Sequence, residues 1–296
     1  MPRDRDYNRD DRDDDRPRRR DDRRRDDDDD RPRRRRYDDE DDFDRPPPKA
    51  DGTGKVLLIV LSVVGIFLVL GVVGGVFAFL RVKEASGRMA ASNNLKQVGI
   101  ALHSYHDVNN TLPSPFMDPD ARGFGLPRST LAPADRLSWR ANILPYIEQA
   151  NLYQLLDPTE AWNGPRNGTA TRAAVKTFGD PLDPVDANTR LRVFVDNGAL
   201  FDSDPKQRVP LARVMDGTSN TIMVAEGGER VPWGQFNEYQ FDPVGPLPPL
   251  GHPNRDTILV LMADGSVKSI RKSISPTAMK AAITRAGNEE IDPEFR

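Results

Sequence analysis

The sequence predicts an α+β protein in which a single transmembrane helix continues into a long domain helix, and this domain helix packs on an antiparallel β-sheet. Three observations support this prediction. Residues 56–80 form an apolar run without a charge, residues 81–108 keep helical spacing of their apolar side chains, and the β-rich segments come only later in the chain. A helix that precedes all the strands is typical of an α+β arrangement rather than of alternating βα units.

The apolar run of residues 56–80 is 25 residues long and is flanked by Lys55 and Arg81. At about 1.5 Å per residue, a helix of this length crosses the roughly 30 Å hydrocarbon core of a bilayer with some tilt. A buried core helix is the alternative, but such helices rarely run this far without a charge. Because 55 hydrophilic residues precede the run and no A-x-A-like cleavage site follows it directly, we expect an uncleaved signal-anchor.

The charges close to the span do not decide its orientation, since three basic residues flank each end. The 16 further arginines before Arg45 favour a cytoplasmic N-terminus. We therefore expect a single-pass protein of the inner membrane, with its large domain, residues 81–296, outside the cytoplasm.

Gly71 and Gly75 form a G-x-x-x-G motif within the span. Small residues at this spacing let two membrane helices approach closely, so the span offers a face for homo-oligomerisation. Glycine is common in membrane helices for other reasons, and the motif by itself does not decide between a monomer and an oligomer.

Residues 1–55 form a low-complexity tail with 19 Lys and Arg, 21 Asp and Glu, and almost no aliphatic side chains. Such a chain cannot bury enough apolar surface to offset the roughly 1–2 kcal/mol per residue that backbone ordering costs, so we expect it to be disordered. A nucleic-acid-binding arm is the alternative. Phosphate attraction needs a surplus of positive charge, and the interspersed aspartates remove that surplus, so no nucleic-acid partner is expected.

The large domain is close to neutral, with 24 basic and 25 acidic side chains, and the whole chain has no cysteine. The absence of cysteine excludes disulfides, thiol nucleophiles and thiolate zinc sites together. About 215 residues are enough for a domain whose stability comes from its own hydrophobic core.

The helices of the domain can be placed from apolar spacing and from proline. The first helix continues outward from the span, and Pro113 and Pro115 are expected to end it. Residues 138–156 again show helical spacing, with Pro145 either kinking this helix or starting a second one. Residues 162–186, which contain two Asn-Gly pairs, are expected to form turns.

Strands are predicted over residues 191–195 and 221–225. The clearest signal is a hairpin, in which residues 257–262 and 266–270 meet at Asp264-Gly265, a dipeptide that favours a tight turn.

A short helix over residues 276–285 is expected to close the domain and to end at Gly287.

Several segments carry a resemblance when they are taken together and in order. They are Asn93-Asn94-Leu95-Lys96-Gln97 with Gly99, Leu102, His103, Tyr105, His106 and Asp107; Leu112-Pro113; Ser138-Trp139-Arg140; Leu144-Pro145-Tyr146-Ile147-Glu148-Gln149; Asp216-Gly217-Thr218-Ser219-Asn220-Thr221 with Glu226; Ala263-Asp264-Gly265-Ser266-Val267; and Thr284-Arg285-Ala286-Gly287. The chain resembles, over about residues 81–290, a large family of planctomycete pilin-like proteins whose shared domain has no assigned function.

The resemblance implies a type IV pilin or type II secretion pseudopilin-like architecture, with the N-terminus inside. Two features depart from the pilin pattern. The prepilin cleavage signal is missing, because Lys55 follows Gly54 and Ile59 stands where pilins carry a glutamate. Ser92 stands where many relatives have a cysteine. We therefore expect a membrane-resident relative that has left filament assembly.

His103 and His106 are the first candidates for metal binding, since side chains three apart on a helix share a face. They lack an evident third ligand: His252 is far along the chain, and Asp107 and Glu148 qualify only by residue type. The favoured interpretation is that both histidines form hydrogen bonds in the helix–sheet interface. No metal and no cofactor are therefore expected.

Asp180, Asp183 and Asp186 are candidates for calcium, as are Asp202 and Asp204. The resemblance adds weight here, because some pseudopilins bind calcium in a loop of the sheet. Neither cluster has the spacing of an EF-hand loop, and aspartates beside prolines are typical of turns.

The leading hypothesis is a non-catalytic, membrane-anchored envelope protein that acts through protein–protein contacts with an envelope partner. No G-x-S-x-G motif is present, and no thiol enzyme is possible without cysteine. The alternative is an extracytoplasmic module that binds a small ligand or calcium with its sheet-side loops. A concave polar pocket around residues 216–220 and His252 would favour this alternative.

Overall fold

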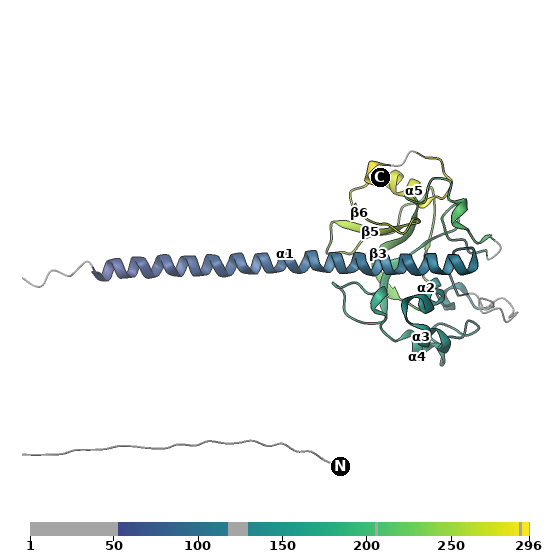
Figure 1. Ribbon diagram of the computed structural model, residues 1–296, viewed down its shortest axis with the longest axis horizontal. Helices are drawn as coiled ribbons and strands as arrows, with labels where there is room; N and C mark the ends of the chain where they lie inside the picture. The colour runs from purple at the N-terminus through teal and green to yellow at the C-terminus, as the bar shows by residue number, and fades with distance from the viewer. Residues whose placement is uncertain (1–52, 118–129, 205–206, 290–291, 296) are drawn as a thin grey trace, which may run out of the picture. The chain divides into compact units, whose positions relative to one another are not determined.

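A computed structural model describes residues 53–117, 130–204, 207–289 and 292–295 (Figure 1). The predicted disorder of the tail concerns residues that lie almost entirely outside this described part. The chain divides into two compact units, residues 1–63 and residues 64–296, and the whole folded domain belongs to the second.

Helix α1 runs without interruption from Thr53 to Asn109 and is 57 residues long. This confirms the prediction that the apolar run and the first domain helix are one helix. Within the described part of the chain, Gly54–Phe79 is the one helical stretch long and apolar enough to cross a membrane, with a mean hydropathy of 3.3. Its apolar side chains are exposed, as those of a lipid-facing helix would be.

The helical spacing predicted that α1 ends near residue 108, and this end is confirmed, but Pro113 and Pro115 are not what ends the helix. The helix ends at Asn109, because Asn110 adopts the left-handed conformation with φ of 58°. The N–H of Asn110 donates to the carbonyl of His106 at 2.6 Å. Asparagine tolerates this conformation and caps helices in this way, so the chain has already turned before the first proline.

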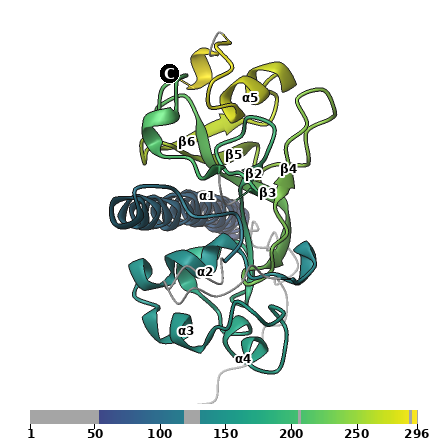
Figure 2. The same cartoon turned by 90° about the vertical axis from the view of Figure 1, so that its right-hand side faces the viewer.

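The sheet that packs on α1 has four antiparallel strands in the order β1-β3-β5-β6 (Figure 2). The strands are β1 (Asn188–Arg192), β3 (Ile222–Pro232), β5 (Thr257–Met262) and β6 (Val267–Arg271). A separate parallel pair joins β2 (Phe194–Val195) to β4 (Tyr239–Gln240). The single strand predicted over residues 191–195 is therefore two strands in different sheets, and β3 extends seven residues beyond the predicted strand.

The predicted hairpin is confirmed as β5 and β6, paired from Thr257 with Arg271 to Leu261 with Val267. The loop between the paired residues Met262 and Ser266 contains three residues, as the predicted strand bounds imply. Gly265 alone takes the positive φ, of 84°, and its N–H donates to the carbonyl of Met262 at 2.9 Å. This is the three-residue hairpin in which a glycine follows a type I turn.

Short helices complete the domain. They are α2 (Trp139–Ile143), α3 (Ala150–Leu155), α4 (Asn167–Thr171) and α5 (Pro276–Ile283), with 3-10 turns η2 (Pro133–Asp135), η3 (Leu144–Ile147), η4 (Lys176–Phe178), η6 (Leu211–Arg213) and η7 (Pro293–Phe295). The predicted break at Pro145 is confirmed, since Pro145 opens η3 between α2 and α3.

Two local predictions fail. The second Asn-Gly pair, Asn167-Gly168, lies in α4 instead of a turn, because the Asn167 amide donates to the carbonyls of Asp157, Glu160 and Ala161 at 2.8–3.0 Å and holds that loop on the helix. Helix α5 ends with Thr284, whose backbone is extended with ψ of 148°, before Gly287 is reached.

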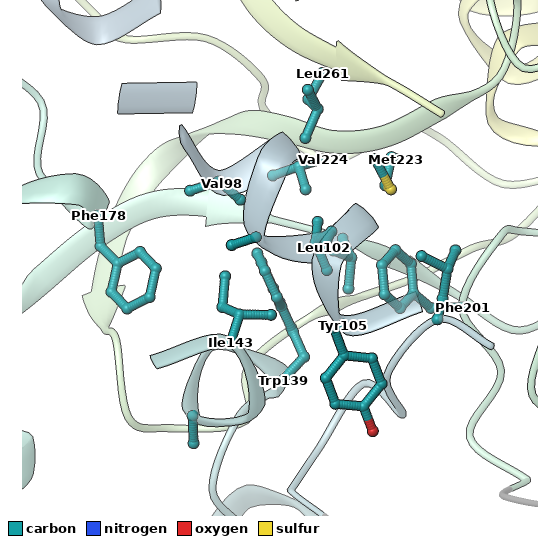
Figure 3. Packing of buried hydrophobic residues seen from close by; sticks show 14 of the residues in the cluster. Val98, Leu102, Tyr105, Trp139, Ile143, Phe178, Phe201, Met223, Val224 and Leu261 are labelled. Atoms are coloured by element: carbon teal, nitrogen blue, oxygen red, sulfur yellow. The ribbon is translucent and has the colours of Figure 1, made fainter. Parts of the chain in front are cut away.

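The core lies on both faces of the sheet. On one face, α1 buries Leu95, Val98 and Leu102, which meet Trp139 of α2 and Val224 of β3 (Figure 3). On the other face, α5 covers a second apolar cluster made of residues such as Ile258, Val260, Ile270, Met279 and Phe295. The domain helix is therefore a central core element, between the sheet and the short helices α2 and α3 (Figure 2).

Close packing of α1 on β5 predicts a stability effect at Gly99. A Cβ at Gly99 would lie 2.8 Å from Cδ1 of Leu261, which is fully buried. Gly99→Ala is therefore expected to cost about 1–3 kcal/mol of unfolding free energy, as overpacked cores do. Gly87→Ala is the matched control, because its Cβ would meet Leu182 at an ordinary 3.5 Å and alanine favours helix. Urea unfolding of the full chain in detergent, followed by tryptophan fluorescence, measures both. Equal stability of the two variants would contradict the packing described.

Candidate functional site

A cluster of buried charges gathers where a loop crosses between α1 and the sheet. We call residues 180–186 the aspartate loop, after its three carboxylates. Arginines from β1, from β3 and from the segment before β5 reach this loop, and each of the three aspartates meets at least one of them. The loop is therefore fixed by the strands it passes.

Asp180 belongs to a buried chain of charges. Its Oδ2 lies 2.7 Å from Nη1 of Arg255, and Oε1 of Glu226 lies 2.7 Å from the same nitrogen. The other oxygen of Glu226 accepts the N–H of Leu259 at 3.0 Å. The Glu226 and Arg255 side chains are only 3% and 1% exposed. One guanidinium thus joins β3, the aspartate loop and the start of β5.

Asp183 is held by two arginines and a histidine. Arg190 donates to both of its oxygens, at 2.7 and 3.0 Å, in the bidentate geometry that guanidinium favours. Nε of Arg230 lies 3.6 Å away, and Arg230 also pairs with Asp186. Nε2 of His252 lies 3.3 Å from Oδ1 of Asp183.

The tautomer of His252 follows from its neighbours. Its Nδ1 accepts the N–H of Asn254 at 3.1 Å, so the neutral ring carries its proton on Nε2 and donates it to Asp183. Burial and the nearby Arg190 lower the pKa of His252, which favours this neutral form. His252 therefore acts as a structural donor and not as a cation.

The pKa values of two carboxyls in the cluster, those of Asp183 and Glu226, shift in opposite directions. Burial alone would raise the pKa of Asp183, but hydrogen bonding and charge from Arg190, with His252 and Arg230, outweigh it and lower that pKa. Burial raises the pKa of Glu226 despite the N–H of Leu259 and the charge of Arg255. Asp183 is thus held ionised by its partners, and Glu226 depends on Arg255 for its charge.

Acidification is expected to weaken the fold through His252. Because the pKa of His252 is lower in the folded chain, the unfolded chain binds the proton first. Stability should fall as the pH drops through about 6.5, the ordinary value for histidine, toward the folded pKa. Glu226, with its raised pKa, acts in the opposite direction at lower pH, so the comparison belongs between pH 7.5 and 6. Thermal melts should show that His252→Gln loses less stability between pH 7.5 and 6 than the wild type does. An equal loss in the two proteins would contradict the role given to His252.

A second buried pair joins α2 to β1 and β4. Nη2 of Arg140 lies 2.9 Å from Oε1 of Glu238, and both side chains are completely buried. Arg140 also donates to the carbonyl of Leu191 at 3.0 Å, while Glu238 accepts the N–H of Val193 at 2.8 Å. Burial lowers the pKa of Arg140 to about 10, so it stays charged at neutral pH. The Trp139-Arg140 motif therefore serves as a structural clamp.

The two histidines proposed as a metal pair have different partners. Nε2 of His106 accepts the N–H of Leu211 at 3.2 Å, and its Nδ1 lies 3.8 Å from Asp107. His103 instead lies against the hairpin loop, where a Cβ on Gly265 would be 3.4 Å from its Nε2. Among the residues that the structure describes, no group of three or more His, Cys, Asp or Glu side chains is arranged to hold a metal.

The Asn-Asn-Leu-Lys-Gln motif fixes α1 to η4. Asn94 donates to the carbonyls of Lys176 and Gly179 at 3.2 and 2.9 Å, and Gln97 accepts from the Thr177 hydroxyl at 3.2 Å. Leu95 is buried, whereas Asn93 and Lys96 are exposed.

The Asp216 motif closes onto the C-terminal motif. The Asp216 carboxylate accepts the N–H groups of Gly287 and Asn288 at 2.7 and 2.9 Å. Gly217 has a positive φ of 93°, and the Asn220 amide donates to the Asp216 carbonyl at 2.9 Å. Ser219 accepts from Lys268 through its carbonyl. The remaining motif residues are also structural: Pro145 opens η3, and Glu148 ends it with a φ of 61°.

A polar pocket shared by residues 216–220 and His252 would have favoured a ligand-binding module, but these two groups do not lie together. Residues 216–220 lie beside the β5–β6 loop, since the Asp264 N–H donates to the Thr218 carbonyl. His252 lies at the other end of the hairpin, where its carbonyl accepts from Lys272. The two groups are therefore at opposite ends of the same two strands.

The hollows of the domain are lined by other residues. A groove of about 200 Å³ lies between α1 and the aspartate loop, lined by Ala90, Asn94, Val175, Pro181, Pro184 and Val185 among others. A hollow of about 300 Å³ lies between β5 and α5, lined by residues such as Leu250, Ile258, Lys272 and Met279. Both linings are mostly apolar.

Three of the aspartates considered for calcium, Asp180, Asp183 and Asp186, are paired with arginines. Asp180 and Asp183 each lie 2.7 Å from a guanidinium nitrogen, and a cation would have to displace these arginines. These partners, Arg190, Arg230 and Arg255, were not predicted from the sequence, and neither was the Glu238 partner of Arg140. The one available signal was charge inside β-rich segments, as at Arg190 and Arg192.

Together, the structure defines a protein with a candidate membrane-anchor helix that continues into the core of an α+β domain. Residues 81–243, more than half of the chain, match the family described as "Protein of unknown function (DUF1559)", and the chain belongs to this family. No curated protein and no solved structure matches the chain. The Asn-Asn, Trp-Arg and Asp216 motifs lie within the matched residues, whereas the hairpin and the C-terminal motif lie beyond them.

Proposed function

We propose that the protein is a non-catalytic, single-pass protein of the cell envelope that acts by binding other envelope proteins. Its N-terminus lies in the cytoplasm, the apolar half of α1 crosses the inner membrane, and the domain of residues 81–296 lies outside. One observation carries this proposal: α1 is at once the candidate membrane anchor and the core helix of the domain. Such a helix places the domain directly above the bilayer without a flexible linker.

The architecture supports a pilin-like relationship. A long apolar N-terminal helix whose second half packs on an antiparallel sheet is the plan implied by the sequence resemblance to pilins and pseudopilins. Ile59 and Lys55, at positions where pilins carry the glutamate and the cleavage signal, favour a protein that stays in the membrane.

The buried charges also support a role without catalysis. Glu226, Arg255 and Asp180 satisfy one another, as do Arg140 and Glu238. Residues with perturbed pKa values are often catalytic, but they also occur in structural ion-pair networks. Here the perturbed groups hold separate strands and loops together, which favours the structural role.

Topology is tested with protease added to intact spheroplasts. The domain should be digested while the cytoplasmic tail survives, as detected with antibodies against each part. Digestion of the tail with protection of the domain would reverse the orientation. A mature product that begins near Lys55 would show that the anchor is processed.

Partner binding is tested with photo-crosslinking residues placed in living cells at Met215 and Val244, which are 75% and 91% exposed. A discrete adduct with an extracytoplasmic protein is expected from at least one exposed position. The same residue at buried Val260 is the control. Failure to form an adduct at any exposed position of the domain would contradict the proposal.

A small-ligand-binding module remains the second candidate, because the apolar groove of about 200 Å³ beside the aspartate loop is large enough for a small apolar group. A ligand that binds only the folded chain increases the free energy of unfolding by RT ln(1 + [L]/Kd) and so raises the melting temperature. Thermal melts with calcium and with chelator should show no difference under the leading proposal. A calcium-dependent increase would move the assignment to the binding module.

A further inference from the structure

One face of α1 carries an apolar repeat that no described part of the domain covers. Its members follow alternating steps of four and three residues, the heptad spacing of coiled coils. We call this set the α1 seam; it consists of Val64, Leu68, Gly71, Gly75, Ala78, Val82, Ala85 and Met89.

The seam is open along its whole length in the single chain. Val64, Leu68, Val82 and Met89 are 49%, 65%, 67% and 68% exposed. A Cβ built on Gly71 or on Gly75 would meet nothing within 4 Å.

The C-terminal part of the seam lies beyond the apolar span. The span ends at Phe79, whereas Val82 and Met89 follow it on the aqueous side. Lipid can cover the first part of the seam, but Met89 lies ten residues, about 15 Å along the helix, past Phe79, where water would be in contact with its apolar side chain. This part of the seam therefore needs another cover.

The domain packs on the opposite side of α1. Leu182 lies against Gly87, and Ala91 and Val98 are buried in the core. At 100° per residue, these positions lie roughly opposite the seam. The seam ends where the repeat reaches Lys96 and Gly99, because Gly99 is covered by Leu261. A second helix can therefore lie along the seam without displacing the domain.

We propose that the α1 seam is the interface of a parallel dimer formed by two copies of this chain. Chains with one span insert in the same orientation, so a two-fold axis along α1 places each seam residue opposite itself, in lipid and in water alike. Gly71, Gly75 and Ala78 allow close approach of the two helices, and flanking larger side chains such as Leu68 pack as knobs. A different partner would need an apolar repeat at the same depths, both in the membrane and just outside it. A second copy of this chain has that repeat because its sequence is identical.

This inference rests on the proposed membrane anchoring, and disulfide trapping in native membranes tests it. The chain has no cysteine, so single-cysteine variants need no background substitutions. Val82→Cys and Ala78→Cys, on the seam, should form covalent dimers under mild oxidation. Glu84→Cys and Phe77→Cys lie at matched depths on the far side of the helix and should not. Equal trapping at all four positions, or none at the seam, would overturn the dimer.

A second comparison distinguishes a specific dimer from disulfides that form when chains meet by chance in the membrane. Gly75→Leu, added to the Val82→Cys chain, should reduce trapping several-fold because a bulky side chain separates the helices. Gly65→Leu is the control: it lies in the same span, off the seam, and a Cβ there also meets open space in the single chain. If both leucines reduce trapping equally, the seam is not the interface.

Carbonate extraction of the same membranes separates the two proposals. A chain that is released by carbonate contradicts membrane anchoring itself. A chain that stays in the membrane but gives no trapped dimer contradicts only the dimer.

Discussion

Replacing Arg140 with methionine is expected to destabilise the domain by about 3–5 kcal/mol, because it leaves the buried Glu238 carboxylate with Arg192, whose Nε is 4.0 Å away, as its remaining ion-pair partner. The two side chains are 2.9 Å apart and fully buried, so water cannot take the place of the lost charge. The variant also removes the hydrogen bond to the Leu191 carbonyl. Urea unfolding of the full chain in detergent, followed by tryptophan fluorescence, measures the change.

The control is the double variant Arg140→Met with Glu238→Leu, which removes both charges. Buried ion pairs can often be replaced by apolar groups at little cost, so this variant should recover much of the lost stability. A single variant as stable as the wild type would contradict the clamp between α2 and the strands. A double variant no better than the single one would show that the carboxylate is not the cause of the loss.

Arg255→Met is expected to cost a similar amount, about 3–5 kcal/mol, for a related reason. Arg255 neutralises Glu226, which is 3% exposed and whose pKa is already raised by burial. Without Arg255 this carboxyl has a strong tendency to bind a proton. The destabilisation should therefore shrink as the pH is lowered, since a neutral Glu226 no longer needs the cation.

Glu226→Gln in the Arg255→Met background tests this cause. The glutamine can still accept the Leu259 N–H and carries no charge, so it should restore part of the stability at neutral pH. Unfolding curves at pH 7 and pH 5 give the comparison. A loss that is independent of pH, and that the second substitution does not relieve, would contradict the role given to Arg255.

The architecture could be predicted because its strongest signals are local. The uncharged run, the continued helical spacing and the absence of a breaker near residue 80 are properties of neighbouring residues, and they gave α1 as one helix. The Asp264-Gly265 turn likewise fixed the β5–β6 hairpin. Where two local signals competed, part of the prediction failed. α1 ends close to the predicted residue 108, but Asn110 and not the prolines ends it, and the Asn167 amide has tertiary partners that keep it in α4.

The buried charge clusters could not be predicted because their members come from distant parts of the chain. Asp183 and His252 are 69 positions apart, and Arg140 and Glu238 are 98 positions apart. Sequence spacing showed the aspartates as a cluster and suggested calcium, but it could not show that two strands and the segment before β5 would bring arginines to the same loop. Helical spacing alone could not assign the neighbours of the two histidines either, since His103 and His106 share a helix but turn to different neighbours.

The central claim is that α1 is one rigid helix from the membrane into the core of the domain. It is tested most directly by the distance between spin labels at Val72 and Val108, both exposed, in the full chain in lipid nanodiscs. Labelled chains are diluted with unlabelled ones, so that only distances within one chain contribute. The two positions are 36 residues apart, and an uninterrupted helix predicts a narrow distribution centred at about 54 Å. A broad distribution, or one centred well below this distance, would show a hinge between the membrane and the domain and would contradict the account.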